Sequence, residues 1–143
     1  MLDIVTLHEK KSNCIKYLMN SLVTYLGVTE AIFVHKNGQS VSSSSARKFD
    51  TPEIYRTLVE TSTVFEELYY PTDIHFYTRT AKKEIKEWIN NEGVLTFLVS
   101  KVSNSNDTFG NIILVEKNVQ RIWQDRDKAL LMYVDRLIEL LLK

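Results

Sequence analysis

Two apolar segments flank a polar turn between Val94 and Glu116, and this stretch limits the possible folds more than any other. The first segment, 94–102, mixes apolar and polar residues, whereas the second, 112–115, is apolar at every position. Asn, Ser, Asp and Gly gather between them, which is typical of a turn that joins antiparallel strands. A strand without a polar face is usually covered on both sides. The pattern therefore predicts a central hairpin with helices on one face and a second layer on the other.

Helical periodicity is found at both ends of the chain. Up to Leu26, apolar residues recur at three- and four-residue spacing, and Gly27 supplies a stop. A last helix is expected from about Asp125 to the C-terminus, where acidic residues in the first turn suit the helix dipole. This helix carries more apolar residues than one face needs. We expect Leu140 to Leu142 to have no partner within the chain.

The middle of the chain supplies the remaining elements. They are a strand at 31–35, the turn Asn37-Gly38, a return strand near 39–43, a helix opening at Thr51, a weak strand at 74–77 and a helix from Thr80 to Asn91. Tight turns make neighbouring strands antiparallel. The order predicts one α+β domain over residues 1–143, with a central antiparallel sheet and both terminal helices on one face.

Composition excludes several classes of partner. The 18 basic and 18 acidic residues balance, so no net positive field is available to attract nucleic acid. No apolar run approaches the roughly twenty residues that a membrane span needs. The start of the chain lacks the pattern of a secretion signal, and the single cysteine fits a reducing compartment. The expected location is the cytoplasm.

Catalytic and metal-binding patterns are not visible. The three histidines, His8, His35 and His75, lie far apart in the sequence, without the paired spacing of metal ligands. No glycine-rich phosphate loop and no nucleophile beside a base can be identified. We therefore predict no catalytic residue, no metal and no cofactor. An enzyme remains a hypothesis that would require His75, an acidic residue and a hydroxyl in one cleft.

The order of elements resembles that of a GAF domain, the small-molecule sensor module of many signalling proteins. The residues that carry the resemblance are the strand 94–102, the turn 104–108, the strand 110–115, Trp123-Gln124, Asp127 and the helix from Leu130. The ending also resembles the sensor domains that precede diguanylate cyclase modules in bacterial signalling proteins. A roadblock-like or profilin-like fold has similar ends, but the extra helix at 80–91 favours GAF.

Three branches of the GAF family fit this sequence poorly. Cyclic-nucleotide-binding members carry an Asn-Lys-Phe-Asp-Glu signature, which is absent here. Bilin-binding members need a cysteine near the pocket, whereas Cys14 lies in the first helix and is expected to be half-buried. The methionine sulfoxide reductase branch needs several cysteines to cycle through a disulfide. The ligand is therefore not identified by the resemblance.

The resemblance implies a ligand cavity between the sheet and the segments that join its middle strands. An aromatic cluster falls in these segments, and aromatic walls with a few polar tips suit a small organic ligand. The alternative is that the same side chains fill a minor core. The candidate ligand-binding residues are Tyr69, Tyr70, His75, Phe76, Tyr77, Arg79 and Trp88.

The surplus apolar residues of the terminal helices predict a homodimer, because soluble proteins avoid such patches on free surfaces. The expected interface residues are Leu18, Leu22, Leu130, Val134, Leu137 and Leu141. The last helix can also continue into an output domain beyond this chain. Two functions follow as hypotheses: a non-enzymatic sensor that signals through the last helix, or an interaction module whose second face is filled by its own side chains.

Overall fold

The computed structural model describes residues 4–37, 39–43, 68–69, 83–104, 106–119 and 121–143. The elements in these ranges are α1 (Ile4–Leu26), β1 (Glu30–His35), β2 (Ser40–Ser42), β3 (Leu68–Tyr69), α4 (Lys83–Glu92), β4 (Thr96–Ser103), β5 (Thr108–Glu116) and α5 (Asp125–Leu142). The strands form one antiparallel sheet in the order β2-β1-β5-β4-β3. The β4–β5 hairpin is therefore at its centre, as predicted.

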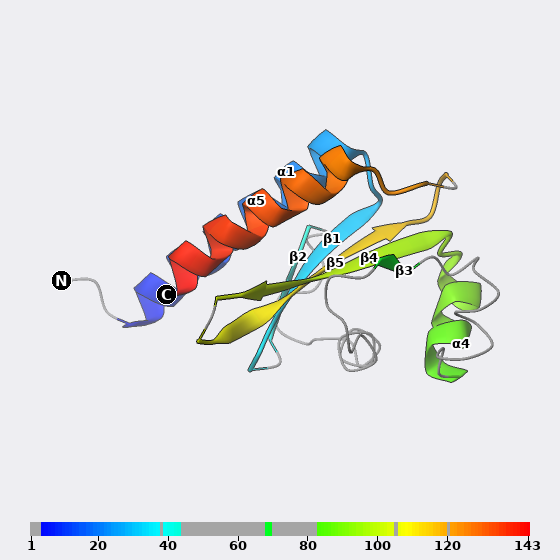
Figure 1. Cartoon of the computed structure of the whole chain (residues 1–143). Helices are drawn as coiled ribbons and strands as arrows, with labels where there is room; N and C mark the ends of the chain where they lie inside the picture. Colours follow the sequence, from blue (N-terminus) through cyan, green and yellow to red (C-terminus); the bar gives the residue numbers. More distant parts are fainter. Residues whose placement is uncertain (1–3, 38, 44–67, 70–82, 105, 120) are drawn as a thin grey trace.

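Helices α1 and α5 lie side by side on one face of the sheet, which confirms the predicted arrangement of the chain ends (Figure 1). Ile15, Met19 and Leu22 form the buried stripe of α1. Leu131, Val134 and Ile138 form that of α5, at the three- and four-residue spacing of a helix face. They pack against the side chains of β1, β4 and β5 that point the same way, and these contacts make the larger hydrophobic core.

The boundaries of the two long helices follow from local chemistry. Gly27 adopts φ +71°, a left-handed conformation that favours glycine, and its amide donates to the Val23 carbonyl at 2.8 Å. At the start of α5, the Gln124 amide donates to Oδ2 of buried Asp127 at 2.9 Å. An acidic residue in the first turn also suits the positive end of the helix dipole. Both helix ends predicted from the sequence are confirmed.

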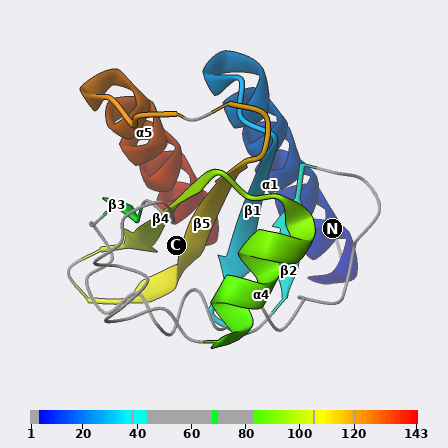
Figure 2. The same ribbon diagram turned by 90° about the vertical axis from the view of Figure 1, so that its right-hand side faces the viewer.

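Helix α4 covers part of the opposite face, which we call the second face (Figure 2). Its Ile89 packs against a smaller core made by Ile32, Val34, Phe97, Val99, Ile113 and Val115 of the sheet with Val94. Trp88 lies against this core, with its ring 5.7 Å from that of Phe97 and tilted by 68°. Separate cores on the two faces explain why β5 has no polar face along 112–115.

The structure differs from the sequence analysis in two places. Strand β3 was not expected at Leu68–Tyr69, because a two-residue strand is defined by its pairing with Leu98 and Phe97 of β4 rather than by a local pattern. Leu141 and Leu142 were expected to lack partners, yet both are half-buried against the larger core. Leu140 remains exposed as expected. The predicted helix at Thr51 and strand at 74–77 lie outside the described residues.

Within the described ranges, no helix combines the length and apolarity required to cross a bilayer.

A polar contact joins α5 to the sheet inside the helical layer. Ser100 of β4 donates a hydrogen bond to Oδ1 of Asp135 at 3.0 Å. Burial raises the pKa of Asp135 from 3.8 to about 7, and the hydrogen bond from Ser100 offsets part of this rise. The nearby charges on α5, Arg136 and Glu139, pair with each other at 2.8 Å, and Lys101 of β4 points to the second face. The carboxyl group is thus held more stably as the neutral acid.

Asp135 should make the protein less stable as the pH rises. Because its pKa is higher in the folded chain than the ordinary 3.8, its favourable contribution is complete below about pH 4 and is lost by about pH 7. Asp135→Asn keeps the shape and an oxygen acceptor without the charge. We expect it to raise the free energy of unfolding at pH 8 by about 1 to 3 kcal/mol, and to change it little at pH 4. Urea unfolding at both pH values checks this, and equal effects at the two would contradict it.

Candidate functional site on the second face of the sheet

The second face changes from apolar to polar along its strands. At one end, Phe97, Val115 and α4 form an apolar floor. Toward the other end, the register aligns Ser40, Val34, Asn111 and Lys101 in one row across β2, β1, β5 and β4. Side chains alternate along a strand, so Asn111 shares the face of Ile113 and Lys101 shares that of Val99. We call this row the polar row.

Asn111 lies on the central strand of the polar row. It is only 4% exposed, and among the described residues its Nδ2 atom has no hydrogen-bond acceptor. Four residues before Val34 on the same face of β1, Glu30 accepts a hydrogen bond from Ser42 Oγ at 2.7 Å. The second face therefore offers an apolar surface, a buried amide donor and charged groups of both signs, a combination that suits a small amphipathic molecule.

The described part of the chain contains two of the predicted ligand-binding residues. Trp88 lies at the apolar end of the second face, and the backbone of Tyr69 pairs with Phe97 at the same end. The other predicted residues, Tyr70, His75, Phe76, Tyr77 and Arg79, lie outside the described residues. Sequence reasoning gave Asn111 no role, although one asparagine inside an apolar strand was a visible signal.

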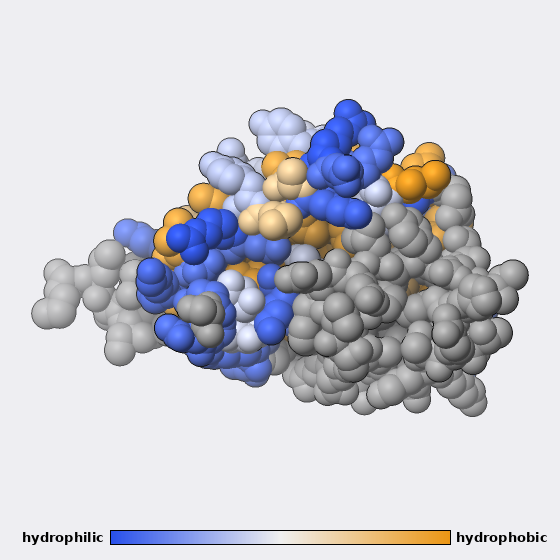
Figure 3. All heavy atoms as spheres, in the orientation of Figure 1, coloured by the Kyte–Doolittle hydropathy of each residue, from blue (hydrophilic) through white to orange (hydrophobic). Residues whose placement is uncertain are grey.

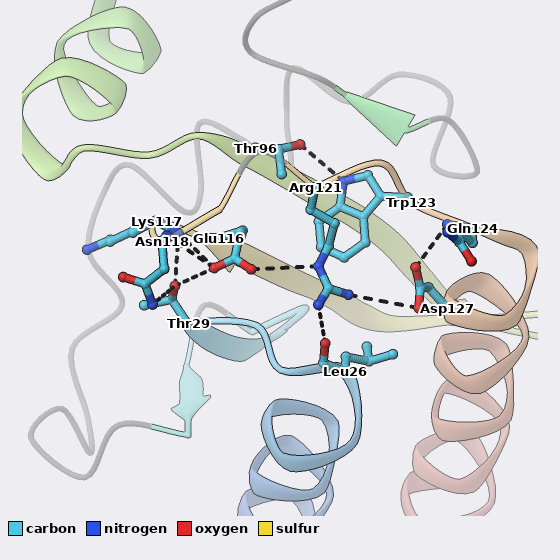
Figure 4. A network of polar contacts seen from close by, with 10 residues as sticks. All are labelled: Leu26, Thr29, Thr96, Glu116, Lys117, Asn118, Arg121, Trp123, Gln124 and Asp127. Atoms are coloured by element: carbon cyan, nitrogen blue, oxygen red, sulfur yellow. Dashed lines mark hydrogen bonds and ion pairs between the residues drawn. The ribbon is translucent and has the colours of Figure 1, made fainter.

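A polar network connects the end of β5 to both long helices (Figure 4). Glu116, the last residue of β5, is fully buried. Its Oε2 accepts hydrogen bonds from Thr29 Oγ1 at 2.8 Å and from the amides of Lys117 and Asn118 at 3.1 and 3.3 Å. Its Oε1 lies 3.6 Å from Nε of Arg121. These contacts compensate for burying a carboxylate at the edge of the core.

Arg121 contacts three elements at once. Besides Glu116, its guanidinium donates to the carbonyl of Leu26, the last residue of α1, and lies 3.9 Å from Oδ1 of Asp127 in the first turn of α5. It also stacks 5.4 Å from the ring centre of buried Trp123, whose Nε1 donates to Thr96 Oγ1 at 3.1 Å. Arg121 therefore joins the end of α1, the end of β5 and the start of α5.

A hollow of about 410 Å³ opens beside this network, between the end of α1 and the start of α5. It is lined by Tyr25, Leu26, Val119, Arg121, Ile122, Gln124, Arg126, Asp127 and Leu130. This is not the place that the sequence predicts for a ligand. Of the two arginines in its lining, Arg121 is already engaged by the carboxylates of Glu116 and Asp127.

The predicted dimer residues are largely occupied by the chain's own core, which corrects part of that prediction. Leu22 and Val134 are buried, and Leu18, Leu130 and Leu141 pack partly against the core, while Leu137 is half-buried. The apolar side chains that α1 and α5 do expose are Tyr17, Tyr25, Met132, Tyr133 and Leu140. Figure 3 shows hydrophobic residues reaching the surface of this helical layer between hydrophilic ones. We call these five residues the outer helix patch.

Cys14, expected to be half-buried, is exposed on α1. It belongs to the helical layer and not to the second face. In the described ranges, no three His, Cys, Asp or Glu side chains gather as metal ligands.

The arrangement of sheet and helices is the GAF fold. The chain is similar to the GAF domain of PixJ from Thermosynechococcus elongatus in its blue-light absorbing form, with 16% identity, a TM-score of 0.65, and coverage of 99% of this chain and 91% of that one. It is also similar to a domain of a putative two-component sensor histidine kinase from Sinorhizobium meliloti 1021, with 13% identity, a TM-score of 0.60, and coverage of 90% and 87%.

A third similar structure is the far-red absorbing dark state of JSC1_58120g3 with bound biliverdin IXa, with 11% identity, a TM-score of 0.57, and coverage of 87% and 84%. No protein-family model matches the chain, and no curated protein matches it. The similarity to these GAF-fold structures confirms the predicted α+β architecture at the level of the fold.

Proposed function

We propose that this chain is a non-enzymatic sensory domain that binds a small molecule on the second face of its sheet and signals through α1 and α5. The observation that carries the proposal is the second face itself, where an apolar floor at Phe97 and Trp88 adjoins the polar row. Similarity to sensor-kinase and photoreceptor domains, one of them holding biliverdin, supports the same function. The domain works in the bacterial cytoplasm as the input of a larger protein, such as a diguanylate cyclase.

The ligand is held without a covalent bond to cysteine. Cys14 is the single cysteine of the sequence, and α1 packs on the other face of the sheet. A thioether at the second face would therefore need a residue that this chain does not have there. The proposed ligand is a small organic molecule held by packing and hydrogen bonds.

Strand β5 links the proposed binding face to the helices. Asn111 lies on its second face, and Glu116 at its end contacts Arg121. A ligand that favours one position of β5 would also favour one arrangement of α1 and α5, because Arg121 contacts both helices at this point. Such a shift between two existing arrangements requires only that the ligand bind them unequally.

A thermal-shift screen with nucleotides, amino acids, organic acids and anions tests ligand binding. We expect a ligand to raise the midpoint of unfolding of the wild-type chain, because it binds only the folded state. Trp88→Ala removes part of the apolar floor and should weaken binding about tenfold or more. Ile122→Ala is the control, since Ile122 is exposed and belongs neither to the second face nor to the outer helix patch. A full shift in Trp88→Ala would place the ligand elsewhere, and no shift with any compound would favour the ligand-free interaction module.

The outer helix patch is proposed to pair with the same patch of a second copy. Tyr133 and Leu140 lie seven residues apart on α5 and so share one side of the helix. We expect a dimer by light scattering, and the double change Tyr133→Glu with Leu140→Glu should raise its dissociation constant about a hundredfold by burying charge. Asn90→Glu, at an exposed position of α4, is the control. A wild-type monomer at high micromolar concentration would refute the dimer.

A further inference from the structure

We infer that Asn111 contacts the ligand directly and that its Nδ2 group donates a hydrogen bond to a carboxylate of that ligand. This inference rests on the proposed binding function and adds the chemical class of the molecule. It starts from a feature that the fold alone does not explain, a buried polar side chain in the middle of the central strand, directly before the apolar run 112–115. The next residues of β5 on the same face are Ile113 and Val115, both in the smaller core.

The position of Asn111 is set by hydrogen-bonded strands on both sides. Its backbone pairs with Val34 of β1 and Lys101 of β4, so its side chain leaves the sheet at the centre of the polar row. The Asn111 side chain must point to the second face, because its neighbours on that face, Val34 and Ile113, both belong to the smaller core. A side chain at this point has a hydrogen-bonded strand on each side.

The amide of Asn111 is buried without a partner. The residue is 4% exposed, and Nδ2 finds no acceptor in the described part of the chain. Burying an unpaired donor destabilises a folded protein, and native structures keep few such groups. A leucine or valine would fill the same space without this penalty, as its neighbours in β5 do. An acceptor supplied by a ligand explains why a donor stands here.

The surrounding charges favour a carboxylate as that acceptor. An Nδ2 group can only donate, so its partner must be an oxygen or another acceptor. Lys101 shares the polar row beside Asn111, so this end of the face carries a lysine, a side chain that binds anionic oxygens. Glu30 lies near the other end of the face, where it would repel an anion. The carboxylate end therefore faces Asn111, and the apolar body lies toward Ile113 and Phe97.

Binding of small carboxylates to three chains tests the inference. The probes are benzoate, phenylacetate and hexanoate, each compared with its primary amide, and affinity is measured by calorimetry on the full chain. Asn111→Leu removes the donor at similar volume, and Asn111→Asp replaces it by a negative charge. We expect each to weaken carboxylate binding about tenfold or more. Asn106→Leu, the same chemical change at an exposed turn position of the β4–β5 hairpin, is the control and should bind as the wild type does.

Stability without ligand supplies the second measurement. Asn111→Leu should have the same or a higher midpoint of unfolding than the wild type, because the unpaired donor is gone. A clearly lower midpoint would mean that the protein itself or a bound water satisfies the amide, and would overturn the inference. Unchanged carboxylate affinity in Asn111→Leu, or binding of the amides as strongly as the acids, would overturn it as well.

The outcomes separate this inference from the proposed function. If the wild-type chain binds another class of compound through Trp88 and binds no carboxylate, the inference fails and the sensory function stands. If the chain binds no compound of any class, the sensory function fails and the inference fails with it.

Discussion

Gly110→Ala is expected to lower the free energy of unfolding by about 3 kcal/mol, an effect at the upper end of those caused by overpacking a core. Gly110 lies in β5 between His35 of β1 and Val102 of β4. A Cβ atom at this position would lie 2.3 Å from the carbonyl oxygen of Val34 and 2.7 Å from the ring of Phe33. The ring is fully buried, and the carbonyl belongs to the neighbouring strand. Neither can move without separating β1 from β5.

Gly93→Ala is the matched control for this experiment. Gly93 has φ +66°, but a Cβ atom there would meet no atom within 4 Å. Its substitution should therefore cost only the strain of a left-handed residue, about 1 kcal/mol. Urea unfolding of both variants measures the difference. If the two losses were equal, the close approach of Phe33 to Gly110 would not be a real constraint on the sheet.

Arg121→Met is expected to lower the free energy of unfolding by about 2 to 3 kcal/mol, because it leaves the buried Glu116 carboxylate without its positive partner. The substitution also removes the contacts of the guanidinium with the Leu26 carbonyl, with Asp127 and with the Trp123 ring. Arg121→Lys keeps the charge but not the planar fork, so it should recover only part of the loss. Chemical unfolding of the two variants provides the measurement.

Hydrogen exchange adds a local test of the same contact. In Arg121→Met, the amides at the end of α1 and at the start of α5 should exchange faster, whereas those at the centre of β5 should change little. Lys117→Met is the control, since the 3.1 Å contact of Lys117 with Glu92 is exposed, and such pairs contribute about 0.5 kcal/mol or less. Equal losses in Lys117→Met and Arg121→Met would show that Arg121 does not join the two helices.

The sequence predicted best those helices and strands whose apolar residues recur at a regular spacing. The buried stripe Ile15, Met19 and Leu22 makes α1 recognisable without any knowledge of what covers it. The uninterrupted apolar run of β5 likewise indicated that the sheet is covered on both faces. Strand β3 carried no such period, because its two residues are extended only through pairing with β4.

The assignment of side chains to core or surface needed the structure. Leu22 and Val134 looked available for a dimer because a helical stripe does not say whether the chain or a partner covers it. The packing of α1 beside α5 decided this, and it left Tyr17, Met132 and Tyr133 outside. For the same reason, the surplus of apolar residues at the end of α5 was smaller than expected.

The sequence alone determined the order of helices and strands, the central hairpin and the placement of both terminal helices on one face, because these depend on the spacing of apolar residues along the chain. Only the tertiary structure revealed the contact of Arg121 with Leu26, 95 residues earlier, and the unpaired amide of Asn111. Such features depend on which distant residues become neighbours. Polar groups such as these do not recur at a regular spacing in the sequence. How strongly they affect the stability of the fold depends on where they are buried.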